Sequence, residues 1–302
     1  MAVKRYWAQS DNTITNAFEE NLTTRATGSN MGASDILEVF SIYAQASSTS
    51  AEKSRALLKF DVTASTNSIQ SDRTAGTIPA SGSVSFYLRL FNAPHSQTLP
   101  KNFTMDVAAV SGSWTEGTGL DMDAYKDKDS SNWTNAVGTS VAATSTATIT
   151  VFAEMTAGET LTLISTDGTT VVATAHAATT TTNDTNTPTF QIVTDAAATA
   201  TNLKTCITNN SKFTASVDGT AVTITQATAG RAGNTVAVVV SSGAVGMTVT
   251  SPFSGGDGAW ATTGGDYYTD TSSSFSASFD SGVEDIEVDI SSLVEQWLSS
   301  SA

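Results

Sequence analysis

The fold is decided by SRALLKFDV at residues 54–62 and SGSVSFYLRL at 81–90, together with IEVDISSLVEQWL at 286–298. In these stretches apolar and polar side chains alternate, a period of two that is typical of a strand with one buried face. The expected inward side chains are Leu58, Phe60, Val62, Val84, Phe86, Leu88, Leu90, Ile286, Val288 and Ile290. Each contributes about 1.5–3 kcal/mol if it is fully buried. Because neither half carries enough apolar surface to fold alone, the sequence predicts that they close one β-sandwich.

Length and charge limit the classes of protein to consider. The chain has 302 residues, which suggests two domains, although one all-β domain can reach about 250 residues. The net charge of −15 disfavours binding to nucleic acid or to an anionic membrane. No apolar run approaches the roughly 20 residues of a membrane-spanning helix. We therefore expect neither nucleic acid nor a membrane among the partners.

Cysteine usage and the N-terminal sequence bear on where the protein is made. Cys206 is the one cysteine, so no internal disulfide framework can form. MAVKRYWAQSDNTITNAF at the N-terminus lacks the apolar core of a signal peptide. These features predict synthesis in a cytoplasm and folding without oxidation.

Residues 147–257 interrupt the sandwich pattern between two linkers of small residues, VGTSVAATSTAT and SPFSGGDG. Within this segment, alternating runs predict strands, Ala197–Asn209 predicts a helix, and Asp218-Gly219 predicts a hairpin. The expected fold is therefore mainly β: a β-sandwich interrupted by an inserted segment of strands and one helix. The expected divisions are an N-terminal arm at 1–34, sandwich at 35–146, the inserted module at 147–257 and sandwich again at 258–302.

The N-terminal arm carries the candidate partner-binding residues Tyr6, Trp7, Ile14, Phe18 and Leu22. The last three are four residues apart, a spacing that permits a short amphipathic helix. One interpretation is a helix or strand laid on the edge of the sandwich. The other is an arm that docks onto a neighbouring subunit. The stretch is too apolar for a free tail.

One acidic segment is a candidate metal site. Asp121, Asp123 and Asp127 alternate with other residues, as at the start of a calcium-binding loop. The segment lacks the glycine and the terminal glutamate of an EF-hand, and Lys126 and Lys128 offset part of its charge. Two interpretations of the segment remain, a calcium-binding site and a solvated surface loop. No other cofactor is expected.

Catalytic patterns are weak. Cys206 lies on the apolar face of the expected helix, which favours a buried small side chain over a nucleophile. Carboxylate pairs can hydrolyse sugars if they lie about 5–10 Å apart, a distance that sequence cannot give. The candidate carboxylates are Glu116, Asp121, Asp123 and Glu295. We expect a protein that is not an enzyme.

Two resemblances add to these expectations. SRALLKFDV, SGSVSFYLRLF, MDVAAVSGSWTEGTG, WATTGGDY and VDISSLVEQWL follow the order of the disaggregatase-related (DNRLRE) domain over most of residues 35–137 and 258–300. That resemblance implies a jelly-roll sandwich of surface proteins, often beside polysaccharide-acting modules. It also implies that Trp114 and Trp260 fill the core, and a core position is favoured for Trp133 too, over stacking on sugars.

The second resemblance covers roughly residues 147–257. TDAAATATNLKTCITNNSKFTASVDGTAVTITQATAGRAGNTVAV, followed by FSGG, looks like a small α+β module of bacteriophage tail and other virion proteins. Together the resemblances imply a structural protein that decorates or stabilises the capsid, neck or tail of a tailed-phage virion. Its partners would be other virion proteins, in a homo-oligomer or in many copies on the particle. The alternative is a carbohydrate-binding adhesin that recognises a surface glycan; a polysaccharide lyase or hydrolase is a third reading.

Overall fold

The computed structural model describes residues 3–64, 66–94, 102–120, 128–138, 142–178, 186–234, 236–270, 272–280 and 284–299. The chain is mainly β, with several sheets and short helices. Contacts divide it into two compact units. The middle unit comprises residues 134–263, and the terminal unit comprises residues 1–133 and 264–302. The middle unit extends beyond both ends of the expected module at 147–257.

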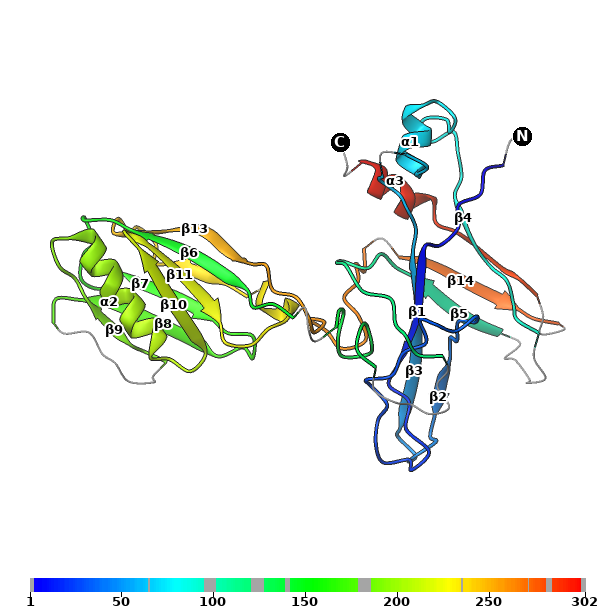
Figure 1. The fold of residues 1–302 in the computed structure, drawn as a ribbon, viewed down its shortest axis with the longest axis horizontal. Coiled ribbons are helices and arrows are strands. Elements are labelled where there is room, and N and C mark those ends of the chain that lie inside the picture. The colour runs from blue at the N-terminus through cyan, green and yellow to red at the C-terminus, as the bar shows by residue number, and fades with distance from the viewer. Residues whose placement is uncertain are drawn as a thin grey trace. The chain divides into compact units, whose positions relative to one another are not determined.

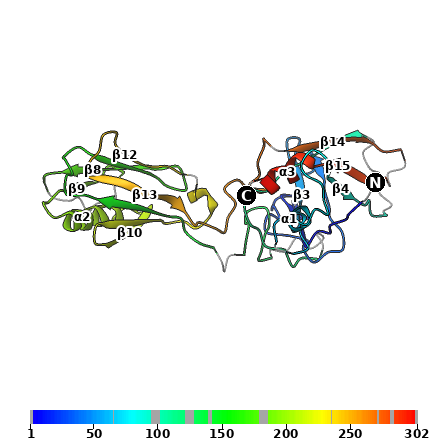
Figure 2. The same ribbon diagram turned by 90° about the horizontal axis from the view of Figure 1, so that it is seen from above.

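The middle unit consists of two four-stranded sheets and a helix (Figures 1 and 2). Its strands are β6 (Thr146–Val151), β7 (Thr160–Ile164), β8 (Thr170–His176), β9 (Thr189–Gln191), β10 (Phe213–Asp218), β11 (Ala221–Gln226), β12 (Val238–Val240) and β13 (Met247–Ser254). One sheet has the order β10-β11-β6-β13 and the other β12-β7-β8-β9, in which β8 and β9 are parallel. Helix α2 (Ala196–Thr208) contacts strands of both sheets, most extensively β10 and β9. A short 3₁₀ helix, η2 (Arg231–Asn234), precedes β12.

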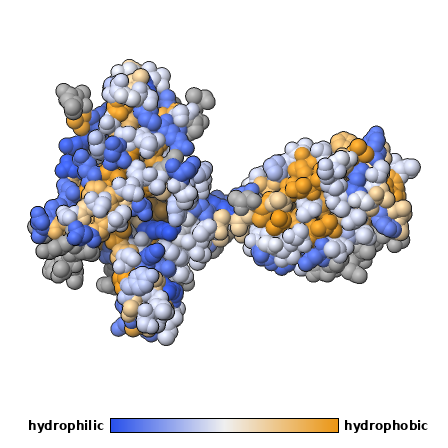
Figure 3. Space-filling view, turned by 180° about the vertical axis from the view of Figure 1, so that it is seen from behind, coloured by the Kyte–Doolittle hydropathy of each residue, from blue (hydrophilic) through white to orange (hydrophobic). Residues whose placement is uncertain are grey.

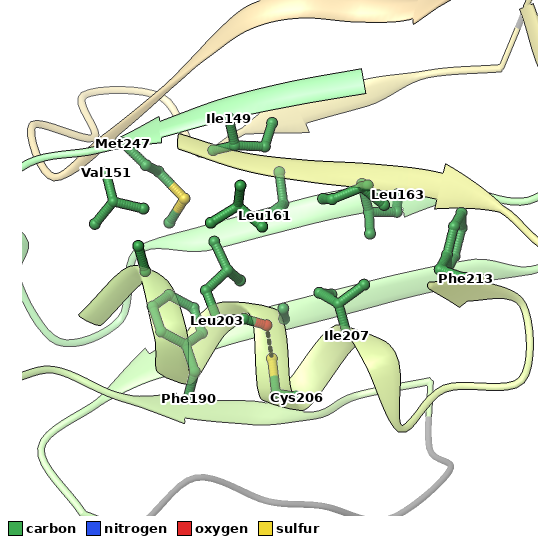
Figure 4. Close-up of a cluster of buried hydrophobic side chains, with 14 of the residues drawn as sticks. Ile149, Val151, Leu161, Leu163, Phe190, Leu203, Cys206, Ile207, Phe213 and Met247 are labelled. Atoms are coloured by element: carbon green, nitrogen blue, oxygen red, sulfur yellow. Dashed lines mark hydrogen bonds between the residues drawn. The ribbon is translucent and has the colours of Figure 1, made fainter. Parts of the chain in front are cut away.

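Alternating side chains of both sheets and one face of α2 meet in a single apolar core (Figure 4). Leu203, Cys206 and Ile207 of the helix are completely buried there, as the sequence predicts. Asp195 caps the helix by accepting a hydrogen bond from the Ala198 amide at 2.9 Å. The hairpin prediction is also confirmed, because β10 and β11 pair up to Asp218↔Ala221 around a glycine at φ +57°.

The terminal unit contains smaller sheets. Its strands are β1 (Ser10–Thr15), β2 (Ser41–Tyr43), β3 (Ala51–Lys59), β4 (Tyr87–Leu90), β5 (Asn102–Val107), β14 (Ser273–Ser278) and β15 (Ile286–Asp289). β1, β3 and β2 form one antiparallel sheet in that order, β14 pairs with β5, and β15 pairs with β4. Helix α1 (Ile69–Thr74) and helix α3 (Ser291–Ser299) share a small apolar cluster.

Distant parts of the sequence pair directly in the terminal unit. β15 lies antiparallel to β4 with Val288 opposite Leu88, and both side chains are buried. On each strand the flanking apolar residues are half-buried, whereas Tyr87, Arg89 and Glu287 face solvent. The predicted alternation of these two strands is therefore confirmed. The predicted association of the stretch at 81–90 with the stretch at 286–298 is confirmed as well.

The inward face of β3 differs from the prediction. Leu57 is 5 % exposed, whereas Leu58, an expected inward residue, is only half-buried. Earlier in the strand the buried side chains are Glu52 and Ser54, at even-numbered positions. The next buried side chain is Leu57, at an odd-numbered position, so the alternation shifts by one residue between Ser54 and Leu57. At Arg55, between them, the guanidinium lies over two aromatic rings of the same unit. Apolar alternation alone cannot reveal a strand whose buried face is partly polar.

Candidate functional site

The N-terminal segment is built into the terminal unit rather than detached from it. β1 pairs along its whole length with β3, from Ser10↔Lys59 to Thr15↔Ser54. Ile14 is completely buried in this sheet. The spacing of Ile14, Phe18 and Leu22 therefore does not form the helix that it permitted, and the strand on the sheet edge is the form observed. This corrects the expectation for Ile14, whose side chain is covered by its own fold.

Tyr6 and Lys4 tie the start of the chain to α1. The Tyr6 hydroxyl donates a hydrogen bond to Asp72 Oδ2 at 2.6 Å, and Lys4 Nζ forms an ion pair with the same oxygen. Burial, followed by the contact with the Asp72 carboxylate, raises the pKa of Tyr6. The hydrogen bonds from Lys4 and then Tyr6 lower the pKa of Asp72. No pattern in the sequence indicates this role of Asp72, because its two partners lie more than sixty residues away.

Trp7 projects from this anchored segment. Its side chain is 73 % exposed, and Val3 on the same segment is 80 % exposed. Leu22 is 41 % exposed at a backbone φ of +52° in a turn. Phe18 is half-buried beneath the Arg25 guanidinium, 4.0 Å from its ring centroid. Of the five expected partner-binding residues, Trp7 and Leu22 thus face solvent.

A shallow hollow of about 380 Å³ lies beside Trp7. It is lined by residues 4–9 together with Asp61 and Asn67. Gln9 donates a hydrogen bond to Asp61 at 3.3 Å, so one wall carries amide and carboxylate groups. Figure 3 shows that apolar residues reach the surface on both units. In the terminal unit such residues include Tyr43 and Phe91 as well as Trp7.

Two tryptophans considered for sugar stacking belong to the core. Trp133 is 8 % and Trp260 is 4 % exposed. The Arg55 guanidinium lies 5.2 Å from the Trp133 ring centroid and 5.1 Å from that of Tyr267. Trp260 has a corresponding partner in Arg231, at 5.1 Å. The core positions expected for these two residues are confirmed, and Trp114 is half-buried.

The candidate calcium ligands Asp121, Asp123 and Asp127 lie outside the described residues. Elsewhere in the described ranges, no three His, Cys, Asp or Glu side chains gather in a way that would hold a metal ion. Calcium binding by the 121–127 segment therefore stays a prediction.

The structure describes two members of the carboxylate set, Glu116 and Glu295, and each has its own hydrogen-bond partner. Glu295 receives two hydrogen bonds from Arg73, which lower its pKa. Glu116 accepts a hydrogen bond from the Asp11 amide at 2.9 Å. Burial raises the pKa of Asp11, and the charge of Glu116 adds to this effect.

Cys206 has the environment of a structural thiol. Its side chain is completely buried on α2, and Sγ donates a hydrogen bond to the Leu203 carbonyl at 3.2 Å (Figure 4). Burial raises the pKa of the thiol to about 12, so it is protonated at neutral pH. The expected burial of this side chain is confirmed.

Comparison with known proteins gives no relative: no protein family, no curated protein and no solved structure matches the chain. Among the helices of the described ranges, none combines the length and the apolar character that a membrane span needs.

Proposed function

We propose that the chain is a non-enzymatic structural protein of a tailed-bacteriophage virion, where it stabilises or decorates the capsid, neck or tail. It is synthesised in the host cytoplasm and binds other virion proteins in many copies. In this proposal the terminal unit is a jelly-roll sandwich and the middle unit is its inserted α+β domain. The resemblance of both segments to surface and virion modules supports the assignment.

The exposed Trp7 on an anchored segment is the observation that carries the proposal. A free tail would lose conformational entropy when it bound a partner, whereas Tyr6 and Lys4 already fix this segment against α1. Besides Lys4, which is paired with Asp72, the segment carries the positive charge of Arg5 in a chain of net charge −15. Its aromatic and basic character suits a protein surface with an apolar patch and acidic groups.

Burial of Trp7 and Val3 is enough for a weak contact at each copy. Large apolar side chains contribute about 1.5–3 kcal/mol each when they leave water, before the costs of association. Repetition over many copies on one particle raises the overall affinity without any new kind of contact. A small contact segment is therefore compatible with a decoration protein.

Incorporation into particles tests the proposal. Virions made with the intact protein should contain it at a fixed stoichiometry, measured by mass spectrometry of purified particles. Trp7→Ala should reduce that amount, while Tyr268→Ala, which removes a different aromatic side chain that is 52 % exposed, should not. Absence of the intact protein from purified particles would overturn the assignment.

A carbohydrate-binding adhesin is the second candidate, and the hollow beside Trp7 favours it. An exposed indole next to amide and carboxylate groups of Gln9, Asp61 and Asn67 can stack on a sugar ring and bind its hydroxyl groups. Binding to a glycan array that is lost in Trp7→Ala and kept in Tyr268→Ala would support this function. An array with no signal from the intact protein would exclude it for the glycans tested.

A further inference from the structure

β2 forms one edge of the sheet β1-β3-β2. Figure 1 shows it alongside β3, and in the part of the chain that the structure describes no other strand pairs with it. Its three side chains are exposed, with Ile42 at 39 % and Tyr43 at 73 %. Val39, just before the strand, is 56 % exposed. An open edge with large apolar side chains is a template for another strand.

The pairing with β3 determines which backbone groups point outward. The Ser54 amide donates to the Phe40 carbonyl at 3.0 Å, and the Ala44 amide donates to the Ser50 carbonyl at 2.8 Å. Ile42 lies between these positions, opposite Glu52. In an antiparallel pair, alternate residues direct both backbone groups to the same neighbour.

Phe40, Ile42 and Ala44 therefore direct their amide and carbonyl groups toward β3. By the same alternation, the amide and carbonyl groups of Val39, Ser41 and Tyr43 point to the open edge. These three residues offer a further strand a regular ladder of donors and acceptors.

We propose that β2 pairs in antiparallel fashion with β2 of a second copy of this chain, with Ser41 opposite Ser41 of the other copy. In this register Val39 faces Tyr43 across the two-fold axis, in a hydrogen-bonded pair. Phe40 faces Ile42 in the closer, non-hydrogen-bonded pair. Every facing pair then combines apolar or small side chains, an arrangement that stabilises cross-strand neighbours.

Charge favours a second copy over an unrelated strand. The stretch Val39–Ala44 carries no charge, in a chain whose net charge is −15. Two identical acidic molecules approach most easily at a surface that lacks charge, and a two-fold contact must be complementary to itself. A different partner of an acidic protein would instead be expected to meet charged groups of the opposite sign.

This pairing deepens the proposed assembly role and rests on it for its purpose. It joins two three-stranded sheets into one continuous sheet and covers an edge that otherwise invites uncontrolled association. The seam is short, so a single pairing is weak, but it adds to other contacts when many copies lie on one particle.

A cysteine at the two-fold axis tests the register directly. Ser41→Cys places two thiols on a hydrogen-bonded pair with Cα atoms about 5.5 Å apart, within the range that a disulfide spans. With diamide as the oxidant, the full-length variant should form a disulfide-linked dimer. Cys206 contributes no background because its side chain is completely buried. Ser242→Cys, at an exposed serine of the middle unit, is the matched control and should link more slowly.

A second variant separates strand pairing from random collision. Val39→Lys and Tyr43→Lys, added to Ser41→Cys, place lysines opposite each other across the axis. Because both positions are exposed, the circular dichroism spectrum should not change, while cross-linking should fall to the rate of Ser242→Cys.

Two results overturn the pairing: Ser41→Cys that links no faster than Ser242→Cys, or linking that persists in the lysine variant. The proposed function is tested separately, by the presence of the protein in particles. Particles that contain the protein while Ser41→Cys fails to link leave the virion role standing without the seam. If Ser41→Cys links rapidly but the protein is absent from particles, the β2 pairing stands and the virion role is overturned.

Discussion

The Arg73 guanidinium donates two hydrogen bonds to the Glu295 carboxylate, at 2.6 and 2.7 Å, and so joins α1 to α3 across most of the sequence. The two side chains are 17 % and 21 % exposed. A bidentate, partly buried pair is stronger than an ordinary surface ion pair. This contact holds α3 against α1, the helix that follows β3.

Glu295→Gln should lower the free energy of unfolding of the terminal unit by about 1.5–3 kcal/mol, because it weakens hydrogen bonds to a charged group. Asp285→Asn is the control, since Arg89 and Asp285 are 50 % and 36 % exposed and their pair should contribute about 1 kcal/mol or less. Chemical denaturation measures both. Equal effects of the two substitutions would contradict the importance assigned to the Arg73 pair.

The same pair predicts a pH dependence. The hydrogen bonds from Arg73 lower the pKa of Glu295 below its unfolded value of about 4.3. Its stabilisation is therefore fully present above that value and is lost as the pH falls through the folded-state pKa. The difference in stability between the natural protein and Glu295→Gln should stay constant from neutral pH to about 5 and shrink at lower pH. A difference that grows as the pH falls would contradict this sign.

Asp72→Asn should release the N-terminal segment. The substitution removes the charge that Lys4 and Tyr6 share, so trypsin should cut after Lys4 and Arg5 faster than in the natural protein. The melting temperature of the middle unit should not change. Unaltered cleavage rates would mean that the segment is held by other contacts.

Much of the middle unit could be predicted because its signals are local. The alternation in β6, β7 and β8, the apolar face of α2 and the Asp218-Gly219 turn each lie within a few residues of sequence. The junction of β4 with β15 was predictable for a related reason: both strands have one apolar face and lack a partner nearby in sequence.

The terminal unit shows where such reasoning fails. Ile14 was compatible with a helix by spacing, and only its pairing opposite Arg55 makes it a strand residue. Glu52 is 1 % exposed, and its Oε2 accepts a hydrogen bond from the Phe18 amide at 2.9 Å. A buried carboxylate of this kind depends on tertiary contacts, as does the anchoring of Tyr6 by Asp72, and neither leaves a pattern in the sequence.

The core of the middle unit should respond strongly to truncation of Leu203. This side chain is completely buried between the two sheets (Figure 4), so Leu203→Ala should cost about 2–5 kcal/mol. Val245→Ala, at a side chain that is 57 % exposed, should change stability by less than about 0.5 kcal/mol. A fragment of residues 134–263 should unfold cooperatively and show the same two effects. A fragment without a cooperative transition would mean that the middle unit needs the rest of the chain.

Glu159 fastens two loops of the middle unit. Its carboxylate accepts hydrogen bonds from the amides of Thr156, Val245 and Gly246 at 3.1, 3.3 and 3.0 Å. Burial alone would raise the pKa of Glu159, but these hydrogen bonds outweigh it and the pKa is lowered. Glu159→Gln should therefore cost about 1–3 kcal/mol at neutral pH, and the cost should shrink as the pH falls from the unfolded pKa of about 4.3 through the lower folded-state pKa. A cost that is independent of pH in denaturation experiments would rule out the charged form as the cause.

Removal of the C-terminal strand should have the largest effect. A chain that ends at Asp285 lacks β15 and α3, so the edge of β4 and the Leu88 side chain lose their cover. Val288, Leu293 and Val294, all nearly inaccessible to solvent in the full chain, are also lost from the core. Exposed strand edges with apolar side chains pair with other molecules, so this truncation should aggregate at neutral pH.

A chain that ends at Ser299 is the control, because it keeps β15 and the whole of α3. Size-exclusion chromatography should find this control monodisperse with an unchanged melting temperature, and should find the shorter chain in the void volume. β4 and β15 both belong to the terminal unit, so the core of the middle unit should still form within the aggregated material. The amides of that core should therefore remain protected from hydrogen exchange. A soluble protein ending at Asp285 that melts like the full chain would show that β4 does not depend on its distant partner.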